Sequence, residues 1–146
     1  MTGPNRRSYV GKWELLFAAW LIALTSTLGA LFIGEVMGQT PCLLCWYQRA
    51  FMFPLAIVLA VACFRSDVGG WVYALPLAAI GWLLAGYHSL LFVGAVSEAV
   101  VPCGASLSCS GADMTILGGV PIPILSLGAF TAIILFILIL RKKAAT

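Results

Sequence analysis

Four long apolar stretches, each about long enough to cross a lipid bilayer, constrain this chain more than any other feature. They run approximately over residues 13–36, 42–64, 71–93 and 122–140. A helix needs about 20 apolar residues to cross roughly 30 Å of hydrocarbon. Because the bilayer core offers a bare backbone no hydrogen-bond partners, each stretch should be a helix, and the short links force neighbours to run antiparallel.

The composition favours the same fold class. Of the 146 residues, 62% are hydrophobic and 9% are charged, with a mean hydropathy of +1.08, far from the values of soluble proteins. The sequence therefore predicts an all-α integral membrane protein, a single membrane domain over residues 1–146 with four helices in an up-down-up-down bundle. Membrane lipid is its expected surrounding.

Lysine and arginine residues mark the expected orientation. They lie before the first stretch, between the second and third, and after the fourth: Arg6, Arg7, Lys12, Arg65, Arg141, Lys142 and Lys143. The opposite loops, residues 35–41 and 94–121, contain neither residue type. By the positive-inside rule both termini should be cytoplasmic. The net charge of +3 then reflects topology and not nucleic-acid binding.

The arginine pair at Arg6 and Arg7, ahead of an apolar run, is also found in twin-arginine and cleaved export signals. The first apolar run is too long for a signal core, and three further spans follow it. An uncleaved first helix explains the pair better.

Four of the five cysteines fall on the predicted outer side. Cys42 and Cys45 begin the second stretch, and Cys103 and Cys109 lie in the long outer loop. Cys63 lies near the other end of the second stretch, about 27 Å from Cys45 at 1.5 Å per residue. We expect Cys63 to be a small buried apolar side chain.

The segment from Pro41 to Arg49 is the most informative about chemistry. Proline suits the first turn of a helix, and the free N–H groups there stabilise a cysteine thiolate. Residues three apart share a helical face, so the sulfurs of Cys42 and Cys45 can form a disulfide bridge. The pattern indicates redox chemistry, although zinc sites and structural bridges use it too.

Arg49 is the only Lys or Arg inside the four stretches away from their ends. Such a charge costs about 2.5–3.5 kcal/mol at a helix centre, so it needs a reason. Lying one turn after Cys45, its guanidinium can stabilise that thiolate and donate hydrogen bonds to a carbonyl oxygen of a ligand. The alternative is that the side chain reaches outward to lipid headgroups.

Together these residues resemble the disulfide bond formation protein B (DsbB) family in its short-loop bacterial form. The resemblance covers nearly the whole chain. It rests on the Cys-x-x-Cys-x-Tyr-x-Arg pattern, a second cysteine pair in the next outer loop, and a Pro-Ile-Pro segment leading the last span: Cys42, Cys45, Tyr47, Arg49, Cys103, Cys109, Pro121 and Pro123.

The resemblance implies an enzyme, a thiol:quinone oxidoreductase in the bacterial cytoplasmic (inner) membrane with its active cysteines on the periplasmic face. Such a protein reoxidises an extracytoplasmic thioredoxin-fold dithiol oxidase, DsbA-like, and passes two electrons to ubiquinone or menaquinone. It thereby supports disulfide bond formation, with no metal or flavin.

The resemblance also assigns catalytic roles by position. Cys103 would form the mixed disulfide with the partner, and Cys109 would then exchange with Cys42. Cys45 would contact the quinone ring, and Arg49 would bind the quinone. Because only five residues separate the two loop cysteines, fewer than in better-known members, the order of attack at these two positions stays open.

His88 is placed like a family histidine that has been linked to the quinone site, and a histidine merely hydrogen-bonded inside the bundle is the alternative. The competing hypothesis for the whole chain is a small structural or zinc-binding membrane subunit whose cysteine pairs are static.

Overall fold

The computed structural model describes residues 6–96, 115–116 and 119–145, with side chains from residue 11 onward. Four long helices dominate it: α1 (Arg6–Leu31), α2 (Leu43–Phe64), α3 (Trp71–Phe92) and α4 (Ile122–Ala145). The short elements are a π-helical turn η1 (Phe32–Val36) after α1, a 3-10 turn η2 (Val68–Gly70) before α3, and an antiparallel pair of strands, β1 (Thr115–Ile116) and β2 (Val120–Pro121), before α4.

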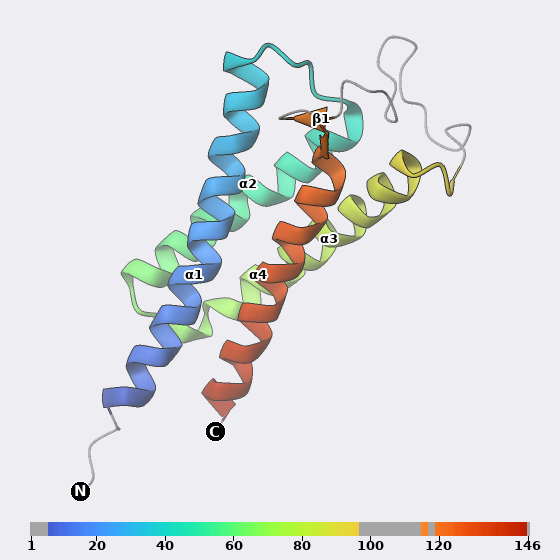
Figure 1. Ribbon diagram of the computed structural model, residues 1–146. Helices are drawn as coiled ribbons and strands as arrows, with labels where there is room; N and C mark the ends of the chain where they lie inside the picture. The colour runs from blue at the N-terminus through green and yellow to red at the C-terminus, as the bar shows by residue number, and fades with distance from the viewer. Residues whose placement is uncertain (1–5, 97–114, 117–118, 146) are drawn as a thin grey trace, which may run out of the picture.

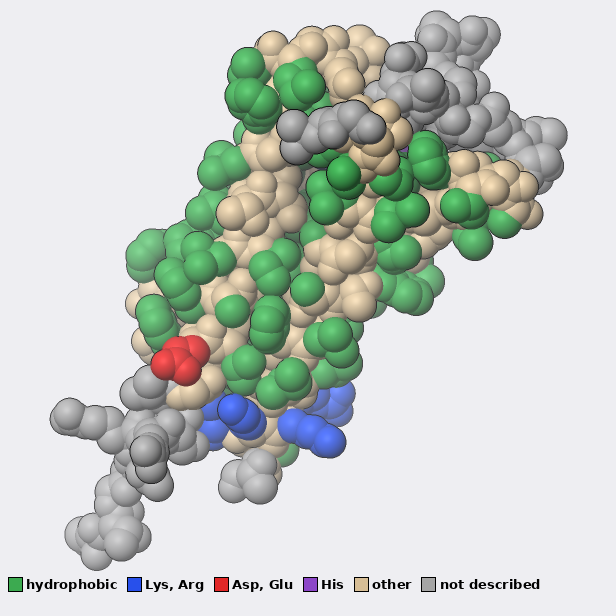
Figure 2. Space-filling model, in the orientation of Figure 1, with side chains coloured by type: hydrophobic (Ala, Val, Ile, Leu, Met, Phe, Trp, Pro, Cys, Tyr) green, Lys and Arg blue, Asp and Glu red, His purple; other side chains and the backbone are tan. Residues whose placement is uncertain are grey.

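Each of the four helices is long and apolar enough to cross a membrane. Large apolar side chains are exposed on every one of them, for example Leu28, Ile57, Leu83 and Leu135. Figure 2 shows such side chains along most of the visible face, with Lys and Arg gathered at one end. Exposed apolar surface of this extent fits a lipid surrounding, and the predicted all-α fold of four long apolar helices is confirmed.

The helices alternate in direction and form a closed ring in which α1 and α3 each pack against α2 and α4 (Figure 1). At one end, the Arg141 guanidinium of α4 lies 4.9 Å from the ring centroid of Trp71, the first residue of α3. The starts of α2 and α4 and the end of α3 meet at the other end (Figure 1). The Lys and Arg residues near the helix ends, such as Arg141, therefore lie at the end of the bundle opposite to the Cys42 pair.

Helix α4 continues to Ala145, past the end expected at residue 140. The additional turn contains Lys142 and Lys143. Lysine forms helices well, and positive charge in a last turn interacts favourably with the helix dipole. Counting apolar residues ends the predicted span at the charged residues, whereas the helical backbone continues through them.

The core contains many small residues, which let the helices approach closely. Its fully buried members on the four helices include Ala19, Ala23, Leu55, Leu59, Ala74, Ala78, Ala85, Phe130 and Ile133. Cys63 also belongs to this core, and the indole Nε1 of Trp13 donates to its carbonyl oxygen at 3.3 Å. Among the described residues, Cys63 thus has the surroundings of a packing side chain.

Helix α4 packs tightly against α3 at Gly81. A Cβ added there would overlap the ring of Phe130, which is 0% exposed. One Cβ added at Gly86, on the same helix, would lie at ordinary contact distance, 3.9 Å from Cδ1 of Leu127. The two glycines differ in the space around them.

We expect Gly81→Ala to lower the free energy of unfolding by about 1–3 kcal/mol, the usual cost of overpacking a core. The measurement is the thermal denaturation midpoint in detergent micelles. Gly86→Ala is the matched control, because helix propensity favours alanine equally at both positions. Equal midpoints for the two variants would contradict the packing described for α3 and α4.

Candidate active site

The candidate site begins at the N-terminal end of α2, where Cys42 is the N-cap residue. Its backbone is extended, and its sulfur accepts a hydrogen bond from the backbone N–H of Cys45 at 3.3 Å. A side-chain acceptor at this position satisfies one of the N–H groups that a helix start leaves free. The sulfur of Cys42 therefore lies at the positive end of the α2 dipole.

Cys42 and Cys45 are both free thiols, and a hydrogen bond joins their sulfur atoms at 3.0 Å. A disulfide needs about 2.05 Å, so a small rotation of the side chains would bring the sulfurs to bonding distance. The two cysteines differ in exposure: Cys42 is 1% exposed, whereas Cys45 lines a cavity. Cys42 is thus enclosed in the bundle, whereas Cys45 forms part of the cavity wall.

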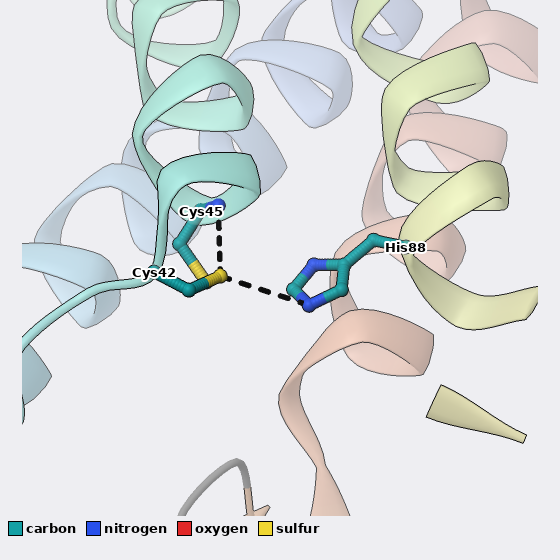
Figure 3. Close-up of side chains that lie close together, drawn as sticks. All are labelled: Cys42, Cys45 and His88. Atoms are coloured by element: carbon teal, nitrogen blue, oxygen red, sulfur yellow. Dashed lines mark hydrogen bonds between the residues drawn. The ribbon is translucent and has the colours of Figure 1, made fainter. Parts of the chain in front are cut away.

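His88 approaches the same sulfur from α3. Its Nε2 lies 3.8 Å from Sγ of Cys42, and its side chain is 0% exposed (Figure 3). Its other ring nitrogen, Nδ1, lies 2.9 Å from Nε2 of Gln48. The hydroxyl of Ser126 donates to Oε1 of Gln48 at 2.6 Å. A chain of hydrogen bonds therefore runs from α4 through α2 to α3 and ends at Cys42.

These contacts act on the acidity of Cys42, which lies just ahead of the second membrane span. Together they lower the pKa of the Cys42 thiol to about 4, and the hydrogen bond with the Cys45 thiol contributes most. The hydrogen bond with His88 and the one from the Cys45 backbone N–H also act to lower this pKa, whereas burial acts to raise it. The arrangement favours Cys42 as the thiolate of the pair.

A cavity of about 990 Å³ adjoins the cysteines, between α1, α2, α4 and the strand pair. Most of its wall is apolar, for example Ile33, Met52, Phe53, Leu125 and Phe130. Cys45, Gln48, Arg49 and Ser126 are among its polar residues. Few polar groups in a mostly apolar pocket are typical of sites for small, largely apolar ligands.

Arg49 lines this cavity, and its guanidinium contacts the backbone of α1. Its Nη2 donates to the carbonyl oxygen of Ala30 at 2.6 Å, and its guanidinium carbon lies 5.7 Å from the ring centroid of Trp46. A Cβ at Gly34, in the π-helical turn, would come within 3.1 Å of the same Nη2. The absence of a side chain at Gly34 leaves room for the guanidinium inside the bundle.

The structure thus brings Cys42, Cys45, Arg49 and His88 to one end of the bundle, but not to one surface. His88 is not among the residues that line the cavity, and Gln48 contacts both the ring and the cavity. Cys103 and Cys109 lie outside the described residues, so their roles stay predictions.

Sequence reasoning missed Gln48 and Ser126. Both are uncharged polar residues inside apolar stretches, and such residues often hydrogen-bond across membrane helices. The signal was stronger for Gln48, because it lies one turn after Cys45 on the same helical face.

Metal binding is a further possibility for this group. Among the described residues, Cys42, Cys45 and His88 offer ligand atoms within 4.8 Å of one another. The hydrogen bonds argue against a metal, because the Gln48 amide donates to Nδ1 and so puts the proton of a neutral ring on Nε2. The nitrogen that faces Cys42 is then a donor, whereas a metal needs its lone pair.

We expect the ultraviolet absorbance of the reduced protein to retain a thiolate contribution as the pH falls, down to about pH 4. The reason is that a lowered pKa keeps the thiol ionised at pH values where an ordinary cysteine is protonated. Cys42→Ser should remove this contribution, whereas Cys63→Ser should leave it. Loss of the thiolate absorbance near the pKa of an ordinary cysteine would contradict the described contacts.

Comparison with known proteins gives several matches. The family described as "Disulfide bond formation protein DsbB" matches residues 12–140. A "Probable disulfide formation protein" of Metapseudomonas resinovorans is 57% identical over 90% of this chain and 92% of its own length. "Disulfide bond formation protein C" of Bacillus subtilis is 38% identical over 88% and 93%, respectively. No solved structure matches the chain significantly.

Proposed function

The chain belongs to the disulfide bond formation protein DsbB family, and from this premise we propose that it is a thiol:quinone oxidoreductase that reoxidises an extracytoplasmic thioredoxin-fold dithiol oxidase. One observation carries the proposal. The sulfur of Cys42 is buried beside His88, while Cys45 shares the wall of an apolar cavity with Arg49. Such a pair can exchange disulfides on one side and give up electrons on the other.

The cavity suits a quinone in size and chemistry. About 990 Å³ of mostly apolar space accepts a flat ring and the start of its apolar tail. Arg49 uses one N–H on the Ala30 carbonyl, and a guanidinium has five, so others are free to bind a ligand oxygen. A quinone bound there supplies an acceptor for two electrons and two protons.

The proposed sequence begins when the dithiol of the partner reduces the Cys103–Cys109 disulfide by exchange. A loop thiolate then attacks the sulfur of Cys42 in the Cys42–Cys45 disulfide, and Cys45 leaves as a thiolate at the cavity wall. The second loop thiolate breaks the mixed bond, which restores the loop disulfide and releases Cys42.

The cycle closes when Cys42 and Cys45 form their bond again. Two thiols then lose two electrons and two protons, which the acceptor in the cavity takes up. Cys42 is the thiolate of this pair, with His88 beside it, and Arg49 holds positive charge on the cavity wall next to Cys45, where an acceptor would take up the two electrons.

The location of the site supports a periplasmic face for the cysteines. Cys42 is the N-cap of α2, and the start of α2 lies at the end of the bundle opposite to the gathered Lys and Arg side chains (Figures 1 and 2). Lys and Arg mark the cytoplasmic end of membrane helices. We propose the bacterial cytoplasmic (inner) membrane as the location, with both termini in the cytoplasm.

The second candidate function is a structural or zinc-binding subunit, which the closeness of Cys42, Cys45 and His88 favours. Mass spectrometry under native conditions, before and after a chelator, separates the two functions. Stoichiometric zinc in the purified protein, together with no disulfide exchange with a dithiol protein, would favour the subunit.

The proposal is tested by quinone reduction with purified full-length protein, a reduced thioredoxin-fold dithiol protein and a soluble quinone. We expect Cys42→Ser and Cys45→Ser to abolish turnover, because each removes one of the two sulfurs that form the bond. Cys63→Ser is the matched control, since Cys63 lies in the core near the other end of α2. Turnover that survives loss of Cys42 or Cys45 would refute the proposal.

Arg49→Ala should raise the KM for quinone roughly tenfold or more, the effect of losing one hydrogen bond to a charged group. The KM for the dithiol protein should change little. Arg65→Ala is the control, because Arg65 is an exposed arginine after the far end of the same helix. An unchanged KM for quinone in the Arg49 variant would rule out the assigned role.

A further inference from the structure

We propose that Gln48, anchored by Ser126, is a positioning residue that fixes the tautomer of His88 and so directs a ring N–H toward Cys42. The catalytic consequence of this inference rests on the proposed function, whereas the tautomer itself does not.

The three side chains come from three different helices and meet inside the bundle. Gln48 is 7% exposed and His88 is 0% exposed. Buried polar groups are costly unless they are hydrogen-bonded, and both are: Ser126 to Gln48 at 2.6 Å and Gln48 to His88 at 2.9 Å. Breaking either hydrogen bond would leave a buried polar group unpaired, so the network is expected to keep its geometry.

The direction of each hydrogen bond determines the tautomer. The Ser126 hydroxyl donates to Oε1 of Gln48, so the amide presents its nitrogen to His88. An amide nitrogen only donates, and Nδ1 of the ring must therefore accept. A neutral imidazole with a lone pair on Nδ1 carries its proton on Nε2, the atom 3.8 Å from Sγ of Cys42.

An N–H directed at Cys42 stabilises a thiolate there, whereas the other tautomer would direct a lone pair at it and repel it. In the proposed cycle, Cys42 is the thiolate that forms the bond with Cys45 again. Ser126 and Gln48 would thus act on the reaction through His88, without touching the reacting sulfur themselves.

The chain contains a single histidine, so histidine labelled with heavy nitrogen gives one pair of ring signals that need no assignment. The experiment uses the full-length protein, reduced, in lipid nanodiscs, and nuclear magnetic resonance of the two ring nitrogens. We expect a protonated Nε2 and an unprotonated Nδ1. The opposite pattern would mean that Gln48 presents its oxygen, and would overturn the proposal.

Two variants test the positioning. Gln48→Met keeps the length of the side chain without its amide, and Ser126→Ala removes the anchor. Either variant should give a mixture of the two His88 tautomers.

Ser89→Ala is the matched control. Ser89 is a buried serine next to His88 in sequence, and its hydroxyl donates to the Ala85 carbonyl of its own helix. If Gln48→Met does not fold, the tautomer in Ser126→Ala tests the proposal by itself. A pure Nε2–H tautomer in every folded variant would overturn the proposal.

Turnover separates positioning from quinone binding, since Gln48 and Ser126 also line the cavity. We expect Ser126→Ala to lower kcat about tenfold with little change in the KM for quinone, and Ser126→Thr, which keeps the hydroxyl, to restore kcat. A raised KM with unchanged kcat would count against positioning. Absence of quinone reduction in the wild-type protein would refute the proposed function, while the tautomer measurement would still test the network.

Discussion

The hydrocarbon core of a bilayer cannot hydrogen-bond a polar side chain, and the polar residues of this bundle meet that constraint through contacts with one another near the start of α2. The sulfur of Cys42 satisfies a free N–H of the first turn. Gln48 connects α4 to the His88 ring, and Arg49 binds a carbonyl oxygen of α1. These hydrogen bonds lower the free-energy cost of burying the polar side chains, and they also fix the orientation of each side chain.

As a result, the two cysteines of the pair have different surroundings. Cys42 is enclosed by the helix start and by His88, contacts that stabilise a thiolate. Cys45 lines the cavity that Arg49 also borders. Because residues three apart on a helix lie on one face, a single turn of α2 holds both sulfurs in contact while exposing them to different surroundings.

The sequence could predict the features that depend on composition and local pattern. Four apolar stretches of sufficient length predicted four helices, and the Cys-x-x-Cys after Pro41 predicted a pair at a helix start. Contacts between helices could not be predicted in this way. Ser126 reaches Gln48 from a helix that begins far along the chain, and room for Arg49 depends on Gly34 in a π-helical turn that no apolar count marks. That His88 lies near a quinone stays a prediction; the structure has its Nε2 beside Cys42 and its Nδ1 beside Gln48.

We propose that electrons leave the protein at the cavity beside Cys45 and Arg49. A photoreactive quinone, crosslinked to the full-length protein in lipid nanodiscs and mapped by mass spectrometry, tests it most directly. We expect adducts on the cavity wall, in residues 25–33 of α1 and η1 and in residues 124–130 of α4, and their loss when unmodified quinone competes. Competable adducts confined to the lipid-facing side of α3 would contradict it.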